Sequence, residues 1–208
     1  ADAEVKVISA LLDAEGNRVG ETASELPVSK DSVATYQQSI QVALPILWSV
    51  VNPYLYTLKT EVWTDDKLVD TYETKTGIRS FEFSAEKGFI LNGKQVKING
   101  VCMHHDLGCL GAAVNRRAIE RQLEILKGMG CNGIRCSHNP PAPELLQLCD
   151  EMGFIVMDET FDMWRKRKTT YDYSRYFNEW HERDLTDLML RDRNHPSIFM
   201  WSIGNEVL

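Results

Sequence analysis

An amide and a carboxylate stand side by side at Asn205-Glu206, after the strand-like run 197–201 and the tripeptide Ser202-Ile203-Gly204. A carboxyl group is a useful proton donor at neutral pH only if its pKa is raised, and partial burial or a second carboxylate nearby has that effect. Glycoside hydrolysis uses such a pair of carboxyl groups. Glu206 is therefore a candidate general acid/base, and Asn205 is a candidate partner for a sugar hydroxyl. The alternative is that Asn-Glu only begins a loop or caps a following helix.

Polar side chains also follow three earlier strand-like runs. They are His104, His105 and Asp106, then Arg135 and His138, then Asp158, Glu159 and Asp162. The histidines and Asp106 could instead bind a metal, but no H-x-x-x-H spacing sets two histidines on one helix face. Histidines that form hydrogen bonds in a polar pocket are the favoured interpretation. Trp164 follows the third run, where an aromatic ring could stack on a sugar or close a loop, and both roles stay open.

The residues after Gly93 alternate between strand-like and helix-like patterns. The strand-like runs are 95–103, 131–138, 154–160 and 197–206. The amphipathic helical patterns between them are 115–130, 141–153 and 177–196. This alternation predicts a parallel sheet with helices packed outside it. In a parallel barrel the functional site is built at the carboxyl ends of the strands. Asn205 and Glu206 are therefore expected at the end of the fourth strand, beside the polar groups of the other three.

The first part of the chain, up to about Phe83, shows the two-residue alternation of β-strands. Residues 35–42 and 56–63 each place apolar side chains on one face, and turn-forming clusters at 13–17 and 65–66 separate neighbouring strands. Several short strands with such turns suggest an immunoglobulin-like β-sandwich. We therefore predict a sandwich over residues 1–84, followed over residues 85–208 by the first four βα units of a (β/α)8 TIM barrel.

Composition excludes several other classes. A net charge of -7 argues against a general nucleic-acid binder, and the basic run 165–168 is predicted to be a solvated loop. No apolar run approaches the roughly 20 residues of a membrane helix. The five cysteines form no C-x-x-C pair, which favours reduced structural thiols over zinc or disulfides. No G-x-G-x-x-G or G-x-S-x-G motif points to a nucleotide or a serine hydrolase.

Several stretches, in order along nearly the whole chain, resemble glycoside hydrolase family 2, the group of β-galactosidases, β-glucuronidases and β-mannosidases. They include "LWSVVNPYLYTLKTEV", "FILNGKQVKINGVCMHHD", "NGIRCSHNPP", "LCDEMGFIVMDE" and "RDRNHPSIFMWSIGNE". The resemblance implies a retaining double-displacement mechanism. Within it, Glu206 matches the general acid/base, and Asn205 matches the residue that binds the sugar 2-hydroxyl. His104 and His138 match histidines that line the sugar subsite.

The same resemblance implies roles for residues around these. Arg135 matches an arginine on the barrel floor that orients carboxylates, and Asp158 and Glu159 match an acidic pair that supports the site. In the branch that "DETFDMW" resembles, Asp162 would face sugar hydroxyls and Trp164 the pocket wall. The segment 160–164 departs from the magnesium-binding pattern of the best-known galactosidases, so no cofactor is expected.

The family's nucleophile is a second glutamate near the end of the seventh barrel strand, and no residue of this chain takes that role. We therefore expect an internal fragment that is inactive alone and prone to self-association. "RCSHNPP" favours a β-galactosidase acting on an oligosaccharide or glycoside. The sequence does not reveal the localisation, for which the bacterial cytoplasm and the periplasm are both open, and a homo-oligomer is one option for the full-length protein. A β-glucuronidase or β-mannosidase is the alternative, and a non-catalytic carbohydrate-binding or structural module is the alternative of another class.

Overall fold

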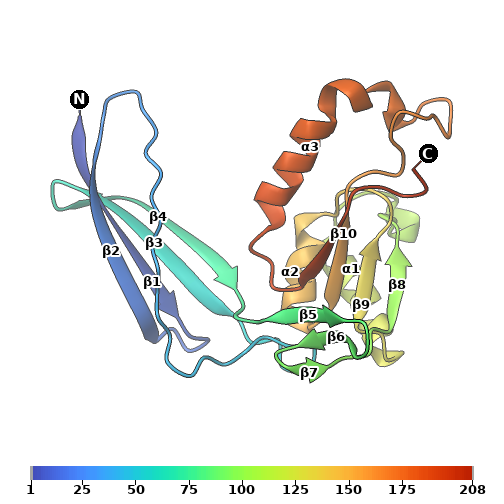
Figure 1. The fold of residues 1–208 in the computed structure, drawn as a ribbon, viewed down its shortest axis with the longest axis horizontal. Coiled ribbons are helices and arrows are strands. Elements are labelled where there is room, and N and C mark those ends of the chain that lie inside the picture. Colours follow the sequence, from blue (N-terminus) through green and yellow to red (C-terminus); the bar gives the residue numbers. More distant parts are fainter. Residues whose placement is uncertain (1, 208) are drawn as a thin grey trace. The chain divides into compact units, whose positions relative to one another are not determined.

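The computed structural model describes residues 2–207, which form two compact units (Figure 1). One unit comprises the residues up to Ile46 together with Tyr54–Ile78, and the other comprises Leu47–Pro53 and the residues from Arg79 onward. None of the helices described is both long and apolar enough to cross a bilayer.

The first unit is built on a four-stranded antiparallel sheet in the order β2-β1-β3-β4. Its strands are β1 (Ala3–Leu12), β2 (Arg18–Val28), β3 (Tyr56–Thr64) and β4 (Lys67–Thr76). The two predicted turns are confirmed. Asp13 accepts hydrogen bonds from the backbone of Glu15 and Asn17. Asp65 and Asp66 both adopt positive φ, at 49° and 58°, as a two-residue hairpin turn of type I′ requires.

The strand predicted for residues 35–42 is absent, because this segment joins no hydrogen-bonded ladder in the described residues. From Gln38 to Val42 its burial nevertheless alternates as predicted, whereas Tyr36 of the predicted face is exposed. Gln38 lies against the sheet. The Gln38 amide donates to the Val7 carbonyl at 3.0 Å and accepts from Ser9 Oγ at 2.6 Å. Side-chain contacts rather than backbone pairing therefore hold this segment, so the second layer of the expected sandwich is an extended segment here.

The second unit contains the predicted parallel sheet, in the order β11-β10-β9-β8. Its elements are β8 (Gly100–Met103), α1 (Arg116–Gly128), β9 (Gly133–Cys136), α2 (Pro143–Met152), β10 (Ile155–Glu159), α3 (Phe177–Asp192) and β11 (Ile198–Ser202). Each strand pairs with its neighbour in sequence, as the wall of a TIM barrel requires. The three helices predicted between these strands are confirmed.

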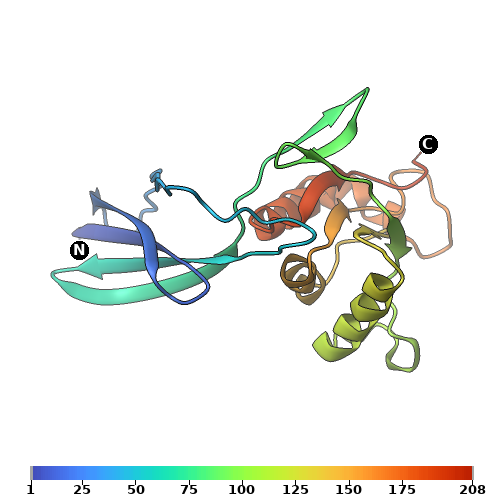
Figure 2. The ribbon, with the colours of Figure 1, turned by 90° about the horizontal axis from the view of Figure 1, so that it is seen from below.

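The core of this unit lies between the sheet and helices α1 and α2, which run along one face of it (Figure 2). Its fully buried members are apolar residues of strands and helices: Leu123, Leu146, Cys149, Phe154 and Val156. Local signals set the helix ends. Asn115 caps α1 by accepting from the Ala118 backbone N–H, and Gly153 ends α2 in the left-handed conformation.

Leu47–Pro53 packs in this second unit although it precedes β3 in the sequence. Trp48 is completely buried, and its indole N–H donates to the Asp150 carbonyl at 2.8 Å. A side chain on Gly153 would meet the Val50 carbonyl oxygen at 2.6 Å, so this close approach requires glycine. The segment therefore anchors to the end of α2.

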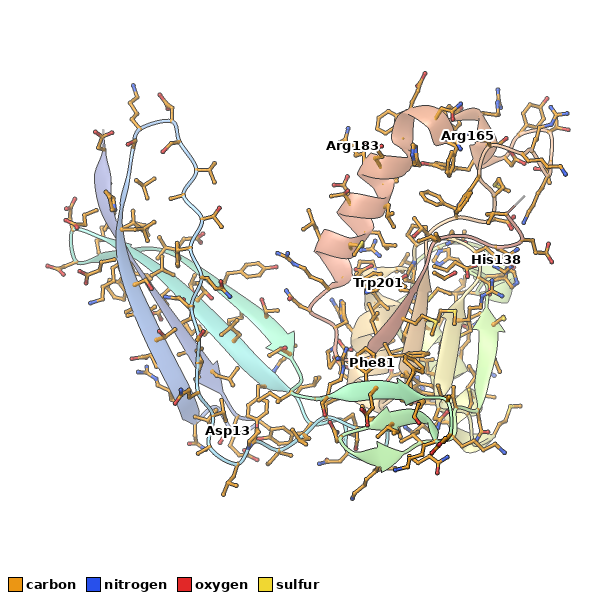
Figure 3. All side chains as sticks on the ribbon, in the orientation of Figure 1. Asp13, Phe81, His138, Arg165, Arg183 and Trp201 are labelled. Carbon is orange, nitrogen blue, oxygen red and sulfur yellow. The ribbon has the colours of Figure 1, made fainter. Side chains whose placement is uncertain are left out.

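A small antiparallel sheet lies at the end of the strands opposite the polar residues (Figure 3). It consists of β5 (Phe81–Ser84), β6 (Gly88–Leu91) and β7 (Lys94–Gln95). The run 95–103, predicted as one strand, is divided between β7 and β8. Phe83 and Phe89 pack against Phe199 of β11, with ring centroids 6.1 and 5.2 Å away. This aromatic cluster covers the amino-terminal end of β11.

Candidate active site

The carboxyl ends of the four parallel strands carry the polar residues singled out from the sequence. His104 follows β8, His138 follows β9, Glu159 ends β10, and Asn205 and Glu206 follow β11. Figure 3 shows His138 at this end of the sheet and Phe81 at the other. The topology thus brings together residues that are about 100 positions apart in sequence, as expected for a parallel sheet.

Glu159 is the centre of a hydrogen-bond network. Its side chain is fully buried, and it accepts from Arg135 Nε at 2.9 Å and Nη2 at 3.0 Å. His138 Nδ1 lies 2.6 Å from its second oxygen, and Ser202 Oγ donates at 2.7 Å. Burial alone would raise the pKa of Glu159, but the hydrogen bonds from Arg135, Ser202 and His138 lower it below its usual range. Glu159 is therefore an ionised carboxylate that fixes the side chains of Arg135, His138 and Ser202 through hydrogen bonds.

Asn205 is fixed at every polar atom. Its backbone N–H donates to the Phe161 carbonyl at 2.9 Å, and its carbonyl accepts from Lys168 Nζ at 2.8 Å. Its side-chain Oδ1 accepts from Arg135 Nη2, and Nδ2 donates to Asp162 Oδ1, both at 3.0 Å. Because an amide offers two donors and two acceptor lone pairs, one of each stays available for a sugar hydroxyl.

Asp162 links the loop after β10 to the end of β11. Its Oδ1 accepts from Asn205 Nδ2 at 3.0 Å and from Lys168 Nζ at 2.9 Å. Burial raises the pKa of Asp162, but these two hydrogen bonds and the Lys168 charge lower it below its usual range. Asp162 is therefore an anionic acceptor that orients the Asn205 amide.

Glu206 projects from this fixed base into open space. Its side chain is 82% exposed, and its backbone adopts a φ of 48°, which is uncommon for a residue other than glycine. The ammonium of Lys168 lies 3.9 Å from its Oε2. An exposed carboxyl group on a constrained backbone can reach a bound substrate while the strand end stays in place.

Trp164 supports the backbone that leads to Glu206. Its indole N–H donates to the Ile203 carbonyl at 2.8 Å. A side chain on Gly204 would meet Trp164 Nε1 at 2.8 Å and Val207 Cγ1 at 2.6 Å, so only glycine fits between them. Trp164 and Glu206 line the same small cavity of about 70 Å³.

The histidines are divided between the site and a neighbouring loop. His104 packs edge-on against His138, with ring centroids 5.3 Å apart. His105 instead contacts the Ala112 carbonyl at 2.8 Å, and Asp106 accepts from the Gly108 backbone. Within residues 2–207, no three side chains of the metal-binding types are grouped closely enough to hold an ion.

The structure separates Asp158 from Glu159, with which the sequence grouped it. Consecutive strand residues face opposite sides of a sheet, so Asp158 points toward the helices while Glu159 points into the polar network. Asp158 is fully buried, and neither of its oxygens has a hydrogen-bond partner within the described chain. Burial and the nearby Asp192 carboxylate raise its pKa to about 7. Asp158 therefore does not join the cluster around Glu206.

Sequence reasoning missed two residues of the site. Lys168 lies in the basic run predicted to be a solvated loop, but its ammonium binds oxygens of Asp162 and Asn205. Ser202 shows no sequence feature beyond its place at the end of the last strand, but its hydroxyl donates to Glu159. No periodicity or spacing marks either residue, since their partners are distant in sequence.

TIM-barrel enzymes build their active sites from polar residues at the carboxyl ends of parallel strands, and the second unit shows this arrangement. Comparison with known families agrees. The family described as glycosyl hydrolases family 2, TIM barrel domain, matches residues 84–208, and the family described as glycosyl hydrolases family 2 matches residues 1–79. The chain belongs to glycosyl hydrolase family 2.

Individual relatives carry two activity names. The chain is 67% identical over 98% of its length to "Beta-galactosidase BoGH2A" of Bacteroides ovatus. It is 42% identical over 94% of its length to a "Putative beta-glucuronidase" of Formosa agariphila. A crystal structure of a family 2 member from Bacteroides cellulosilyticus matches all of it with a TM-score of 0.96 and 43% identity. The chain spans 24%, 18% and 27% of these three proteins.

Proposed function

We propose that the protein carrying this chain is a retaining O-glycoside hydrolase that removes terminal β-linked galactose. Membership of the glycosidase family supports the reaction class, and the 67% identity to a relative named β-galactosidase supports the sugar. The observation that carries the assignment is the position of Glu206 at the end of β11, directly after Asn205, whose polar atoms all form hydrogen bonds. Glu206 itself is exposed in the described residues, so we assign the second carboxylate that a proton donor needs beside it to the nucleophile, outside residues 2–207.

Glu206 is the general acid and then the general base in this proposal. In the first step its carboxyl proton passes to the glycosidic oxygen as the bond to the sugar breaks, and a carboxylate nucleophile forms a covalent glycosyl-enzyme. In the second step the Glu206 carboxylate removes a proton from the water that attacks the sugar carbon and releases the nucleophile. The residue thereby returns to its starting state.

Glu159 is not the nucleophile. Retaining enzymes place the two carboxyl groups about 5–5.5 Å apart with the nucleophile open to the sugar. Both oxygens of Glu159 are occupied by Arg135, His138 and Ser202, and its side chain is fully buried. We therefore place the nucleophile outside residues 2–207, on a later barrel strand, and treat this chain as the half with the acid/base.

The remaining polar residues form the proposed sugar subsite. Asn205 retains a donor and an acceptor for the 2-hydroxyl. His104 and His138 follow β8 and β9 at the same end of the sheet, and Arg135 contacts both His138 and Asn205. Asp162 would accept from a hydroxyl, and Trp164 would form the pocket wall on the Glu206 side. Arg135 and Glu159 fix the positions of Asn205 and His138 through hydrogen bonds.

A β-glucuronidase is the second candidate, because the Formosa agariphila relative at 42% identity carries that name. The two candidates differ at carbon 6 of the sugar, which is a neutral hydroxymethyl group in galactose and a carboxylate in glucuronic acid. A pair of aryl glycosides that differ only there separates them.

The test uses the protein expressed from its complete reading frame. Hydrolysis of p-nitrophenyl β-galactoside, β-glucuronide and β-mannoside is measured for the wild type, Glu206→Gln and Glu182→Gln, in which an exposed glutamate of α3 is changed as the control. We expect galactoside turnover that falls by about 10²–10⁴ in Glu206→Gln and is unchanged in the control. Equal activity of the wild type and Glu206→Gln would refute the acid/base assignment. Turnover of the glucuronide alone would favour the second candidate.

A further inference from the structure

Lys168 forms a three-point contact between two loops at the site. Its Nζ donates to the Asp162 carbonyl at 2.6 Å, to Asp162 Oδ1 at 2.9 Å and to the Asn205 carbonyl at 2.8 Å. An ammonium group has three donors and no acceptor, so these bonds use its whole capacity. Lys168 is therefore unavailable as a direct hydrogen-bond donor to a substrate while this arrangement holds.

The backbone of Lys168 is fixed as firmly as its ammonium. Asp172 is buried and accepts from the backbone N–H groups of Lys168 at 2.6 Å and Thr169 at 2.7 Å. Its other oxygen accepts from Ser174 Oγ at 2.5 Å. Burial would raise the pKa of Asp172, but the hydrogen bonds from Ser174, Thr169 and Lys168 lower it to about 2. This carboxylate therefore holds the loop at all ordinary pH values.

Glu206 depends on this arrangement more than on contacts of its own. Its side chain is largely exposed, and the fixed groups beside it are the Asn205 backbone and the ammonium of Lys168, 3.9 Å from its Oε2. A carboxyl group held at one end only acquires its direction from the backbone that carries it. Misplacing a reacting group by about 1 Å can cost about 10²-fold in rate.

We propose that Lys168 is a positioning residue for the acid/base, because its ammonium joins Asp162 to the Asn205 carbonyl and fixes the direction in which Glu206 leaves β11. The inference rests on the proposed role of Glu206 in glycoside hydrolysis. It assigns a function to one residue of a basic run whose sequence indicates only a solvated loop.

The test exploits the dependence of a general acid on the leaving group. Dinitrophenolate leaves without protonation, whereas an alkoxide must receive a proton, so kcat/KM on an alkyl glycoside requires a positioned acid and kcat/KM on a 2,4-dinitrophenyl glycoside does not. Both constants are measured on one preparation of the complete protein. Their ratio does not depend on the fraction of folded enzyme.

We expect Lys168→Met to lose about 10²-fold in kcat/KM on the alkyl glycoside and less than about 3-fold on the dinitrophenyl glycoside. Lys168→Arg, which keeps a cation and several donors, should recover most of the loss. Lys94→Met, which changes an exposed lysine of β7, serves as the control and should leave the ratio at the wild-type value.

Two results would overturn the inference. An equal loss on both substrates would make Lys168 a merely structural residue, and no loss on either would remove it from the site. Glu206→Gln is measured beside these variants to keep the two proposals apart. If Glu206→Gln shows the leaving-group dependence and Lys168→Met does not, only the inference on Lys168 fails. If Glu206→Gln itself lacks the dependence, the proposed function fails, and the positioning role fails with it.

Discussion

Arg135 and Glu159 form a bidentate ion pair across strands β9 and β10, with N–O distances of 2.9 and 3.0 Å. Glu159 is fully buried, whereas the Arg135 side chain is 32% exposed. The same guanidinium reaches Asn205, so one side chain connects the ends of three strands. Two parallel hydrogen bonds fix direction as well as distance, which makes this pair the rigid base of the site.

Replacing Arg135 should destabilise the fold strongly. Arg135→Met leaves the Glu159 carboxylate buried without its main partner, a change that costs about 3 kcal/mol. Arg116→Met is the matched control. Both side chains of the Arg116–Glu151 pair are exposed, so the pair contributes less than about 1 kcal/mol to the free energy of unfolding. Urea unfolding monitored by tryptophan fluorescence compares the two variants. Equal shifts of the midpoint would contradict the ranking.

Asp158 should make stability fall as pH rises. With a pKa raised from 3.8 to about 7, folded Asp158 keeps a proton that the unfolded chain releases. This stabilisation is complete below pH 3.8 and is lost as pH rises through about 7. Asp158→Asn has no such proton. Its free energy of unfolding, relative to that of the wild type, should therefore rise by about 2–3 kcal/mol from pH 5 to pH 7.

Unfolding midpoints of the wild type and Asp158→Asn, taken at half-unit pH intervals, check this prediction. A constant difference across the range would show that Asp158 titrates normally. The Glu159 carboxylate behaves in the opposite way, because its pKa lies below the ordinary 4.5. Its contribution is present above pH 4.5 and is lost as pH falls through its lowered pKa.

A side chain at Gly204 should displace the strand end that carries Glu206. In Gly204→Ala the new Cβ would lie 2.8 Å from Trp164 Nε1, so the indole or the strand end must shift and Glu206 should move with it. We expect a fall of about 10²-fold in kcat/KM with a small change in stability. Gly128→Ala, at the end of α1, is the control, since nothing lies within 4 Å of its added Cβ. Wild-type kinetics in Gly204→Ala would mean that the contact relaxes without consequence.

The 208-residue chain by itself should be inactive and should self-associate. Its proposed acid/base has no nucleophile opposite it in the described residues, and the outer edges of β8 and β11 carry unpaired backbone groups in this sheet. Light scattering and assays on p-nitrophenyl galactoside check both expectations. A monodisperse monomer would contradict the predicted self-association, and turnover that is absent from the matched Glu206→Gln preparation would contradict the predicted inactivity.

The β/α half of the fold could be predicted from local pattern alone. Amphipathic periodicity predicts α1, α2 and α3, and in the structure Asn115 caps α1 while Pro143 begins α2 and Gly153 ends it. Segment 35–42 shows the limit of this approach. Its alternation predicts an extended chain, but whether a ladder forms depends on a neighbouring strand that the segment itself does not specify.

The sequence by itself determined the family, the order of strands and helices, and the presence of Asn205 and Glu206 at a strand end, because these depend on residues close together along the chain. Tertiary structure alone decided that Glu159 binds Arg135, His138 and Ser202, that Arg135 reaches Asn205, and that Lys168 connects the Asp162 loop to the end of β11. The physical reason is that a hydrogen bond depends on distance and direction in space. The number of residues between two partners in the sequence defines neither their distance nor their direction until the sheet has formed.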